Sequence, residues 1–187
     1  MTNSSETYLF RNLNALGTLA VSAVLITALY DQFASGDLPC PLCLLQRVGF
    51  VAVMSGLVLN IVKGPKADHY SIMIIAAFFG AAVSLRQVSL HVIPGTSTYG
   101  DPFLGLHYYT WAFIVFSMII LGTAIIAAYS TQYHKQRYIA FSDQTALCKI
   151  ALVIAFSIVA VCAIAAFAEC GPGVCPEDPK NYWLLKN

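Results

Sequence analysis

Residues 146–168 read ALCKIALVIAFSIVAVCAIAAFA, an apolar run that contains one charged side chain, Lys149. Four further apolar stretches of comparable length occupy residues 13–30, 44–62, 71–93 and 106–129. Each stretch is long enough to cross the roughly 30 Å of hydrocarbon in a bilayer as a helix. Because a backbone in lipid must satisfy its own hydrogen bonds, such runs form helices rather than strands. The sequence therefore predicts five transmembrane helices.

The composition of the whole chain agrees with a lipid environment. Of its 187 residues, 58% are hydrophobic and 10% are charged, and the mean hydropathy is +0.72. A soluble domain of this length needs more charge to cover its surface. The net charge of +1 provides no basic field for phosphates, which argues against nucleic acid as a partner. We predict an all-α integral membrane protein with a single membrane domain over residues 1–187.

The distribution of basic residues predicts the orientation of the chain. The segments 32–39 and 94–105 contain no Lys or Arg but carry Asp37 and Asp101. Basic residues accumulate on the cytoplasmic side of membrane proteins. We therefore expect a cytoplasmic N-terminus and an external tail over residues 169–187, in a bacterial inner membrane. The basic set expected inside comprises Arg11, Lys63, Lys66, Lys135, Arg137 and Lys149.

Four of the six cysteines are expected outside the membrane. Cys40 and Cys43 precede the second span, and Cys170 and Cys175 follow the fifth. The compartment outside this membrane is expected to be oxidising, and disulfides persist under oxidising conditions. The other two lie in the fifth span and are expected to be packing residues, because a free cysteine behaves as a small hydrophobe.

Cys40-Pro41-Leu42-Cys43 stands where the second helix is expected to begin. An isolated Cys-x-x-Cys fits a redox pair, a metal site or a structural disulfide. At a helix N-terminus the free N–H groups and the helix dipole stabilise a thiolate. Cys43 is nearer the helix, so we expect it to be the better thiolate. Arg47 follows one turn later on the same face, where its charge can stabilise that thiolate.

Residues 39–47, PCPLCLLQR, resemble the signature of the disulfide bond formation protein B (DsbB) family. In that family, two residues separate a Cys-x-x-Cys from an acid or amide followed by Arg. Leu104-Gly105-Leu106 and the following Trp111 resemble the start of the family's fourth helix. The resemblance covers roughly residues 13–130.

The resemblance implies a four-helix transmembrane bundle, here followed by a fifth transmembrane helix. It implies a quinone, ubiquinone or menaquinone, bound beside the dithiol. Cys43 would form the intermediate with the quinone, assisted by Arg47, and Cys40 would resolve it. The electron donor would be a soluble periplasmic thioredoxin-like oxidase of the DsbA type, and the acceptor the membrane quinone pool. The expected activity is that of a quinone-dependent, disulfide-generating oxidoreductase.

The chain departs from the family in the external loop of residues 94–103, which has no cysteine, whereas the well-known members carry a second pair there. It has instead Cys170-Gly171-Pro172-Gly173-Val174-Cys175 after the fifth span. The Gly-Pro-Gly segment allows the tight turn that a disulfide requires. This pair either replaces the loop pair as a relay to Cys40 and Cys43 or is a static staple of the tail. The spacing does not distinguish the two interpretations.

Arg47 is the first candidate for a hydrogen bond to a quinone ring oxygen, and two histidines are further candidates. His91 and His107 lie near the outer ends of the third and fourth spans, at a depth suited to a quinone ring oxygen. Each is alternatively an ordinary interfacial histidine. The remaining histidines, His69 and His134, are expected in cytoplasmic loops, exposed to water.

Three other functions compete with the thiol oxidase. A membrane protein of the same fold could reduce a quinone or quinone epoxide. A metal-binding protein could use Cys40, Cys43, His91 and His107, because thiolates and imidazoles suit Cu(I) or Zn. Arg47 disfavours this option by placing a cation beside the site, and we predict no metal. A structural interaction protein with two stapling disulfides is the third possibility.

Overall fold

The computed structural model describes residues 3–92, 102–133, 138–177 and 179–185, with side chains from residue 8 onward. Its long helices are α1 (Asn3–Tyr30), α2 (Pro41–Lys63), α3 (Ala67–Leu90), α4 (Tyr108–Ala127) and α5 (Ala146–Cys170). A π-helical turn, Asp31–Ser35, extends α1, and short 3-10 turns occupy Ser130–Tyr133, Phe141–Asp143 and Trp183–Leu185. All five long helices are long and apolar enough to cross a membrane. The predicted all-α membrane fold is thereby confirmed.

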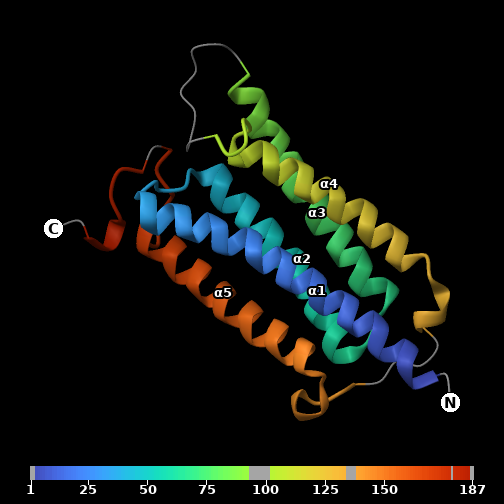
Figure 1. The fold of residues 1–187 in the computed structure, drawn as a ribbon. Coiled ribbons are helices and arrows are strands. Elements are labelled where there is room, and N and C mark those ends of the chain that lie inside the picture. Colours follow the sequence, from blue (N-terminus) through green and yellow to red (C-terminus); the bar gives the residue numbers. More distant parts are fainter. Residues whose placement is uncertain (1–2, 93–101, 134–137, 178, 186–187) are drawn as a thin grey trace.

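The central helix of the assembly is α2, which packs between α1 and α3. On one side α4 covers α3, and on the other α5 lies along α1 and touches α2 (Figure 1). The end of the bundle where α1 and α5 finish and α2 begins is called the dithiol end below, because it carries Cys40 and Cys43. The C-terminal tail folds over this end (Figure 1). The opposite end, around Asn14 and Asn60, is called the asparagine end.

Local chemistry explains where α2 and α5 begin. Cys40 is the N-cap of α2: it has an extended backbone, and its Sγ accepts a hydrogen bond from the N–H of Cys43 at 3.3 Å. Pro41 follows in the first turn, where its missing N–H costs nothing. Thr145 caps α5 in the same manner, accepting from the N–H of Cys148.

Two helices begin four or more residues earlier than the apolar pattern predicts. α1 starts at Asn3 rather than near residue 13, and α3 starts at Ala67 rather than near 71 and ends at Leu90. Polar side chains in these extensions are buried and bonded within the bundle, so the hydropathy pattern misses them. Residue 93, residues 94–101, His134, Lys135 and Arg137 of the predictions lie outside the described residues.

Two expectations about solvent exposure are wrong, because both polar side chains are buried and hydrogen-bonded within the bundle. Arg11 was expected outside the first span on the cytoplasmic side, but it lies buried in α1 and donates to the carbonyl oxygens of Ile61 and Val62. His69 was expected in water, but it is buried in α3 with its Nδ1 2.9 Å from Asn60 Oδ1.

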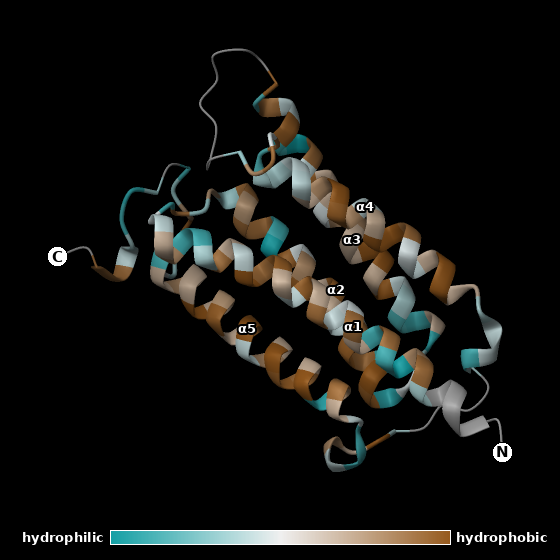
Figure 2. Cartoon of the chain, viewed as in Figure 1, coloured by the Kyte–Doolittle hydropathy of each residue, from teal (hydrophilic) through white to brown (hydrophobic). Residues whose placement is uncertain are grey.

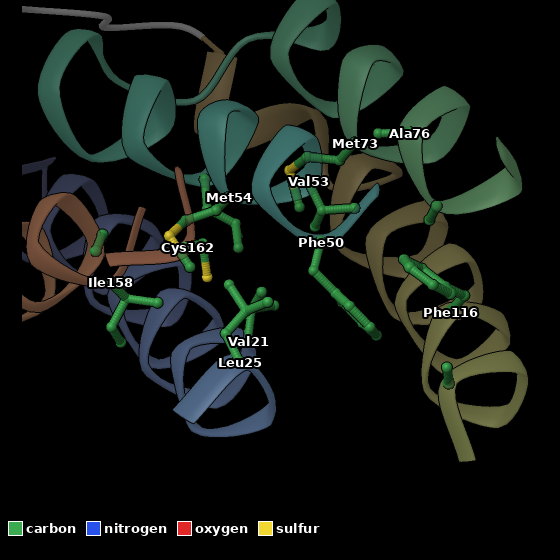
Figure 3. Packing of buried hydrophobic residues seen from close by; sticks show 14 of the residues in the cluster. Val21, Leu25, Phe50, Val53, Met54, Met73, Ala76, Phe116, Ile158 and Cys162 are labelled. Atoms are coloured by element: carbon green, nitrogen blue, oxygen red, sulfur yellow. The ribbon is translucent and has the colours of Figure 1, made fainter. Parts of the chain in front are cut away.

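The buried core forms where α2 meets its neighbours. Phe50, Val53 and Met54 of α2 contact apolar side chains from α1, α3, α4 and α5 (Figure 3). The rings of Phe50 and Phe116 stack with centroids 4.0 Å apart. This close contact requires Gly80 of α3, where a Cβ would lie 2.2 Å from the Phe116 ring. Cys162 is part of this core and Cys148 of a second one, which agrees with a packing role for both.

The outer surfaces of the helices are apolar, as a lipid environment demands. Large apolar side chains such as Ile75, Phe78, Met118, Phe156 and Ile164 are exposed on α3, α4 and α5. Hydrophilic residues gather at the helix ends and along the C-terminal tail (Figure 2). The bundle therefore has polar groups at both ends and an apolar belt between them.

Candidate active site

Cys40 and Cys43 form a close dithiol at the start of α2. Their Sγ atoms are 2.6 Å apart, and Cys40 is buried with 4% of its surface exposed while Cys43 is partly exposed. The hydrogen bond with Cys43, together with burial, raises the pKa of the Cys40 thiol far above its ordinary value. A neutral Cys40 can donate its proton toward Cys43, which fits the expectation that Cys43 is the thiolate of the pair.

A glutamine on α3 contacts both sulfurs. Gln87 is fully buried, and its Nε2 lies 3.3 Å from Cys40 Sγ and 3.3 Å from Cys43 Sγ. Its Oε1 accepts a hydrogen bond of 2.7 Å from Gln46 Nε2, which turns the amide N–H groups toward the sulfurs. Sequence reasoning missed Gln87. The available signal was an amide inside an apolar span, where polar side chains are costly and usually functional.

Arg47 lines the same cavity as the dithiol, and its hydrogen bonds run to α1 and to the π-helical turn that extends it. It donates 2.9 Å to the carbonyl oxygen of Ala28 and 2.5 Å to Gln32 Oε1. Gln32 in turn donates to Glu169 Oε2 at 3.4 Å and to the Tyr182 hydroxyl at 3.2 Å. The fifth helix and the tail therefore belong to the surroundings of Arg47, which the sequence did not indicate.

Cys40 and Cys43 lie on the wall of a cavity of about 750 Å³ between α1, α2 and α4. Ligand pockets have this size and are mainly apolar with a few polar groups. Residues from α1 form one wall, residues from α4 form the other, and Pro179 and Lys180 of the tail contribute to the lining. The lining also includes Cys40, Cys43, Gln46, Arg47, Phe50, Gln87, Phe103, Tyr108, Tyr109, Trp111 and Val115.

The Leu-Gly-Leu segment that precedes α4 shapes one wall of this cavity. Phe103 and Leu106 exchange two backbone hydrogen bonds, of 2.9 and 3.1 Å, around a turn in which Gly105 has φ of 80°. The indole N–H of Trp111 donates to the Phe103 carbonyl oxygen at 2.9 Å. The turn and the tryptophan thus hold each other in place at the mouth of the cavity.

The two candidate histidines lie behind the cavity wall. The rings of His91 and His107 each stack on Tyr109, with centroids 5.3 Å apart in both cases. Tyr109 lines the cavity, whereas neither histidine is among the lining residues. A quinone contact from His91 or His107 therefore stays a prediction.

The described part of the chain gives no support to a metal site. Within it, no group of three or more His, Cys, Asp or Glu side chains lies close enough to hold a metal ion.

Cys170 and Cys175 are joined by a disulfide, with their Cα atoms 4.6 Å apart. Gly171, at φ of 64°, ends α5 and packs against the Trp183 ring, which leaves no room for a Cβ. The disulfide therefore lies at the root of the same tail that reaches the cavity through Pro179 and Lys180.

Fold and site together define a membrane protein with a close pair of cysteines beside a ligand-sized cavity at one end of its helices. Comparison with known proteins identifies the family to which such a protein belongs. Residues 10–101 match the family model described as disulfide bond formation protein DsbB. No solved structure matches the chain significantly.

Relatives named disulfide bond formation protein B agree with that match. The relative from Xanthomonas euvesicatoria pv. vesicatoria is 34% identical over 121 residues, which cover 61% of this chain and 70% of the relative. The relative from Chromobacterium violaceum is 41% identical over 71 residues, or 36% of this chain and 43% of the relative. The chain belongs to the DsbB family. It is thus a multi-pass inner-membrane oxidoreductase of disulfide bond formation.

Proposed function

We propose that this protein is a thiol:quinone oxidoreductase. It reoxidises a soluble periplasmic thioredoxin-like (DsbA-type) oxidase and passes the electrons through Cys40 and Cys43 to ubiquinone or menaquinone in the membrane. The observation that carries the proposal is the position of the Cys40–Cys43 pair on the wall of a 750 Å³ cavity. A quinone ring fits such a cavity, because Arg47 and Gln46 offer donors for ring oxygens among mostly apolar walls.

The electron balance of the cycle is simple. Oxidation of a partner dithiol reduces the Cys40–Cys43 disulfide, through a second cysteine pair or directly, so two partner thiols become a disulfide and two thiols form at Cys40 and Cys43. The quinone supplies a two-electron, two-proton acceptor. Cys43, as the thiolate, delivers the electrons while Arg47 stabilises the charge, and Cys40 gives up its proton as the disulfide closes again. A DsbA-type partner is itself a strong oxidant at about −120 mV, so a weaker acceptor such as glutathione would not suffice.

The orientation follows from the ends of the bundle. Lys63, Lys66 and Lys149 lie at the asparagine end, whereas Asp37 lines the cavity at the dithiol end. By the positive-inside rule the asparagine end and the N-terminus are cytoplasmic, and the dithiol and the tail face the periplasm. The partner oxidase would then meet the protein at the dithiol end.

Cys170 and Cys175 are the proposed relay between the partner and Cys40–Cys43. In support, their disulfide lies in a tail that lines the same cavity as the dithiol. In the relay the partner reduces Cys170–Cys175 first, and this pair then exchanges with Cys40–Cys43. A static staple is the competing role, and the partner would then react with Cys40–Cys43 directly.

The test is quinone reduction, followed optically, when the purified protein receives a reduced thioredoxin-like oxidase. Wild type should turn over and Cys43→Ser should not. Cys148→Ser is the matched control, because Cys148 is a buried free cysteine in the half of α5 away from the dithiol. Loss of turnover in the double variant Cys170→Ser/Cys175→Ser supports the relay, and retention supports the staple. A wild-type protein silent with both ubiquinone and menaquinone contradicts the proposed function.

A further inference from the structure

A buried polar cluster joins α5 and the tail to Arg47. Its centre is Gln32, which is 2% exposed and lies in the π-helical turn after α1. The amide oxygen of Gln32 accepts from Arg47 Nη1 at 2.5 Å. Its amide nitrogen donates to Glu169 Oε2 at 3.4 Å and to the Tyr182 hydroxyl at 3.2 Å. One amide side chain therefore bridges a cation of α2 and a carboxyl group of α5.

Glu169 has an unusual position for an acid. It is 2% exposed near the end of a transmembrane helix, and its Oε1 has no hydrogen-bond partner among the described residues. Burying a carboxylate is costly unless an opposite charge lies nearby. Arg47, across Gln32, is that charge, because a guanidinium stays protonated at all physiological pH values.

We propose that Glu169 is a positioning residue that, through Gln32, holds the Arg47 guanidinium against α1 and limits how strongly this cation stabilises the Cys43 thiolate. The inference deepens the proposed function, on which its meaning for turnover rests. It assigns to the fifth helix a part in tuning the dithiol.

Arg47 lies between two negatively charged neighbours. It lines the cavity with Cys43 on one side and contacts Gln32, and through it Glu169, on the other. When Glu169 is ionised, it draws the Arg47 guanidinium, through Gln32, toward α1 and away from Cys43. When Glu169 is neutral, this pull is weaker, and the guanidinium can move closer to the thiolate. A charge within about 4–6 Å shifts the pKa of a group by about one to three units. A group that acts through an intervening residue, as Glu169 does through Gln32, has a weaker effect.

Other charged and titratable groups surround the same site and must be held constant. They are Cys40, Asp31, Asp37, Tyr108, Tyr109, Cys162, Lys180 and Tyr182. The variants below leave all of them unchanged.

The experiment measures the pH profile of Cys43 alkylation by iodoacetamide in the reduced full-length protein, with the site read by mass spectrometry. Glu169→Gln removes the charge and keeps an oxygen for the Gln32 amide. We expect the pH of half-maximal alkylation rate to fall by about half a unit to one unit. Glu169→Asp keeps the charge and should restore most of the wild-type profile. Destabilised packing around Glu169 would affect both variants alike.

The same comparison in an Arg47→Gln background tests the path of the effect. There the shift caused by Glu169→Gln should shrink to less than half, because the cation through which Glu169 acts is gone. An unchanged profile in Glu169→Gln, or an equal shift with and without Arg47, overturns the inference. The measurement needs neither quinone nor partner. Its failure is therefore distinct from a failure of the proposed function.

Discussion

The two ends of the bundle bury polar side chains in opposite ways. At the asparagine end, Asn60 is fully buried, donates to Asn14 Oδ1 at 2.9 Å, and accepts from the backbone N–H of Lys66 at 3.2 Å. Asn14 donates to the Tyr70 hydroxyl, which donates to Gln132 Oε1 at 2.8 Å. The donors and acceptors of this network face one another and the backbone.

At the dithiol end the polar groups lead to sulfur atoms and a cavity, and Arg47 is only half-buried. Gln87 donates to the two thiols, and Arg47 reaches the cavity wall. The asparagine end thus fastens the helices together, whereas the dithiol end places polar groups next to sulfur atoms and a cavity.

The largest expected effect contrasts Arg47 at the dithiol end with Arg11 at the asparagine end. Arg47→Gln should lower the rate of quinone reduction about 100-fold or more, because it removes a preorganised charge from the reacting centre. Arg11→Gln, at the opposite end, should destabilise the protein and leave the turnover of the folded fraction unchanged. Steady-state assays and thermal unfolding in the same detergent measure both. Equal losses of turnover in the two variants would break the comparison.

At the asparagine end we expect an effect on stability alone. Asn60→Leu removes a side chain that bonds Asn14, His69 and the N–H of Lys66, and leaves these groups unsatisfied. The free energy of unfolding should fall by about 1–3 kcal/mol or more. Denaturant titration followed by circular dichroism provides the value. A quinone-reduction rate that fell tenfold in the folded variant would show that this network also serves the reaction.

Gln87 should show an intermediate effect at the dithiol end. Gln87→Leu removes the hydrogen bonds to both sulfurs, so the Cys43 thiolate should be less stable and its alkylation at neutral pH about tenfold slower. Gln132→Leu is the matched control, since Gln132 is a buried glutamine at the asparagine end. The test compares the alkylation rates at Cys43, measured by mass spectrometry, in the wild type and the two variants. A rate unchanged by the loss of Gln87 would remove it from the site.

The smallest change concerns the pH behaviour of Cys40. Its pKa is raised first by the hydrogen bond with Cys43 and then by burial. A raised pKa keeps a thiol neutral over the range where an ordinary thiol ionises, so Cys40 should resist alkylation between about pH 7 and 9. Cys43→Ala removes the first cause, and Cys40 should then react at lower pH. Cys148, buried at the other end of α5, is the internal reference. An unaltered Cys40 profile in that variant would mean that burial alone protects it.

The apolar pattern predicted most of the fold correctly. It located all five helices, because only helices satisfy their backbone bonds in lipid over such lengths. It placed the starts of α1 and α3 too late, because Arg11 and His69 read as loop residues. Their polar atoms are instead bonded inside the bundle, which the tertiary structure alone shows.

The candidate site was predicted in part. The spacing of Cys40, Cys43 and Arg47 within the first two turns of α2 is local, so the sequence was enough to associate them. Gln87 and Glu169 were missed because they come from α3 and α5 and reach the site only through helix packing.

That this chain crosses a membrane and carries a dithiol at a helix start follows from its sequence alone. Helix length, hydropathy and N-terminal capping are properties of neighbouring residues. Which groups surround the dithiol depends on how the helices pack. The turn before α4 places Phe103 in the cavity lining, Gln87 bridges the sulfurs, and Glu169 meets Arg47 through Gln32. Residues more than a hundred positions apart become neighbours only when the helices pack.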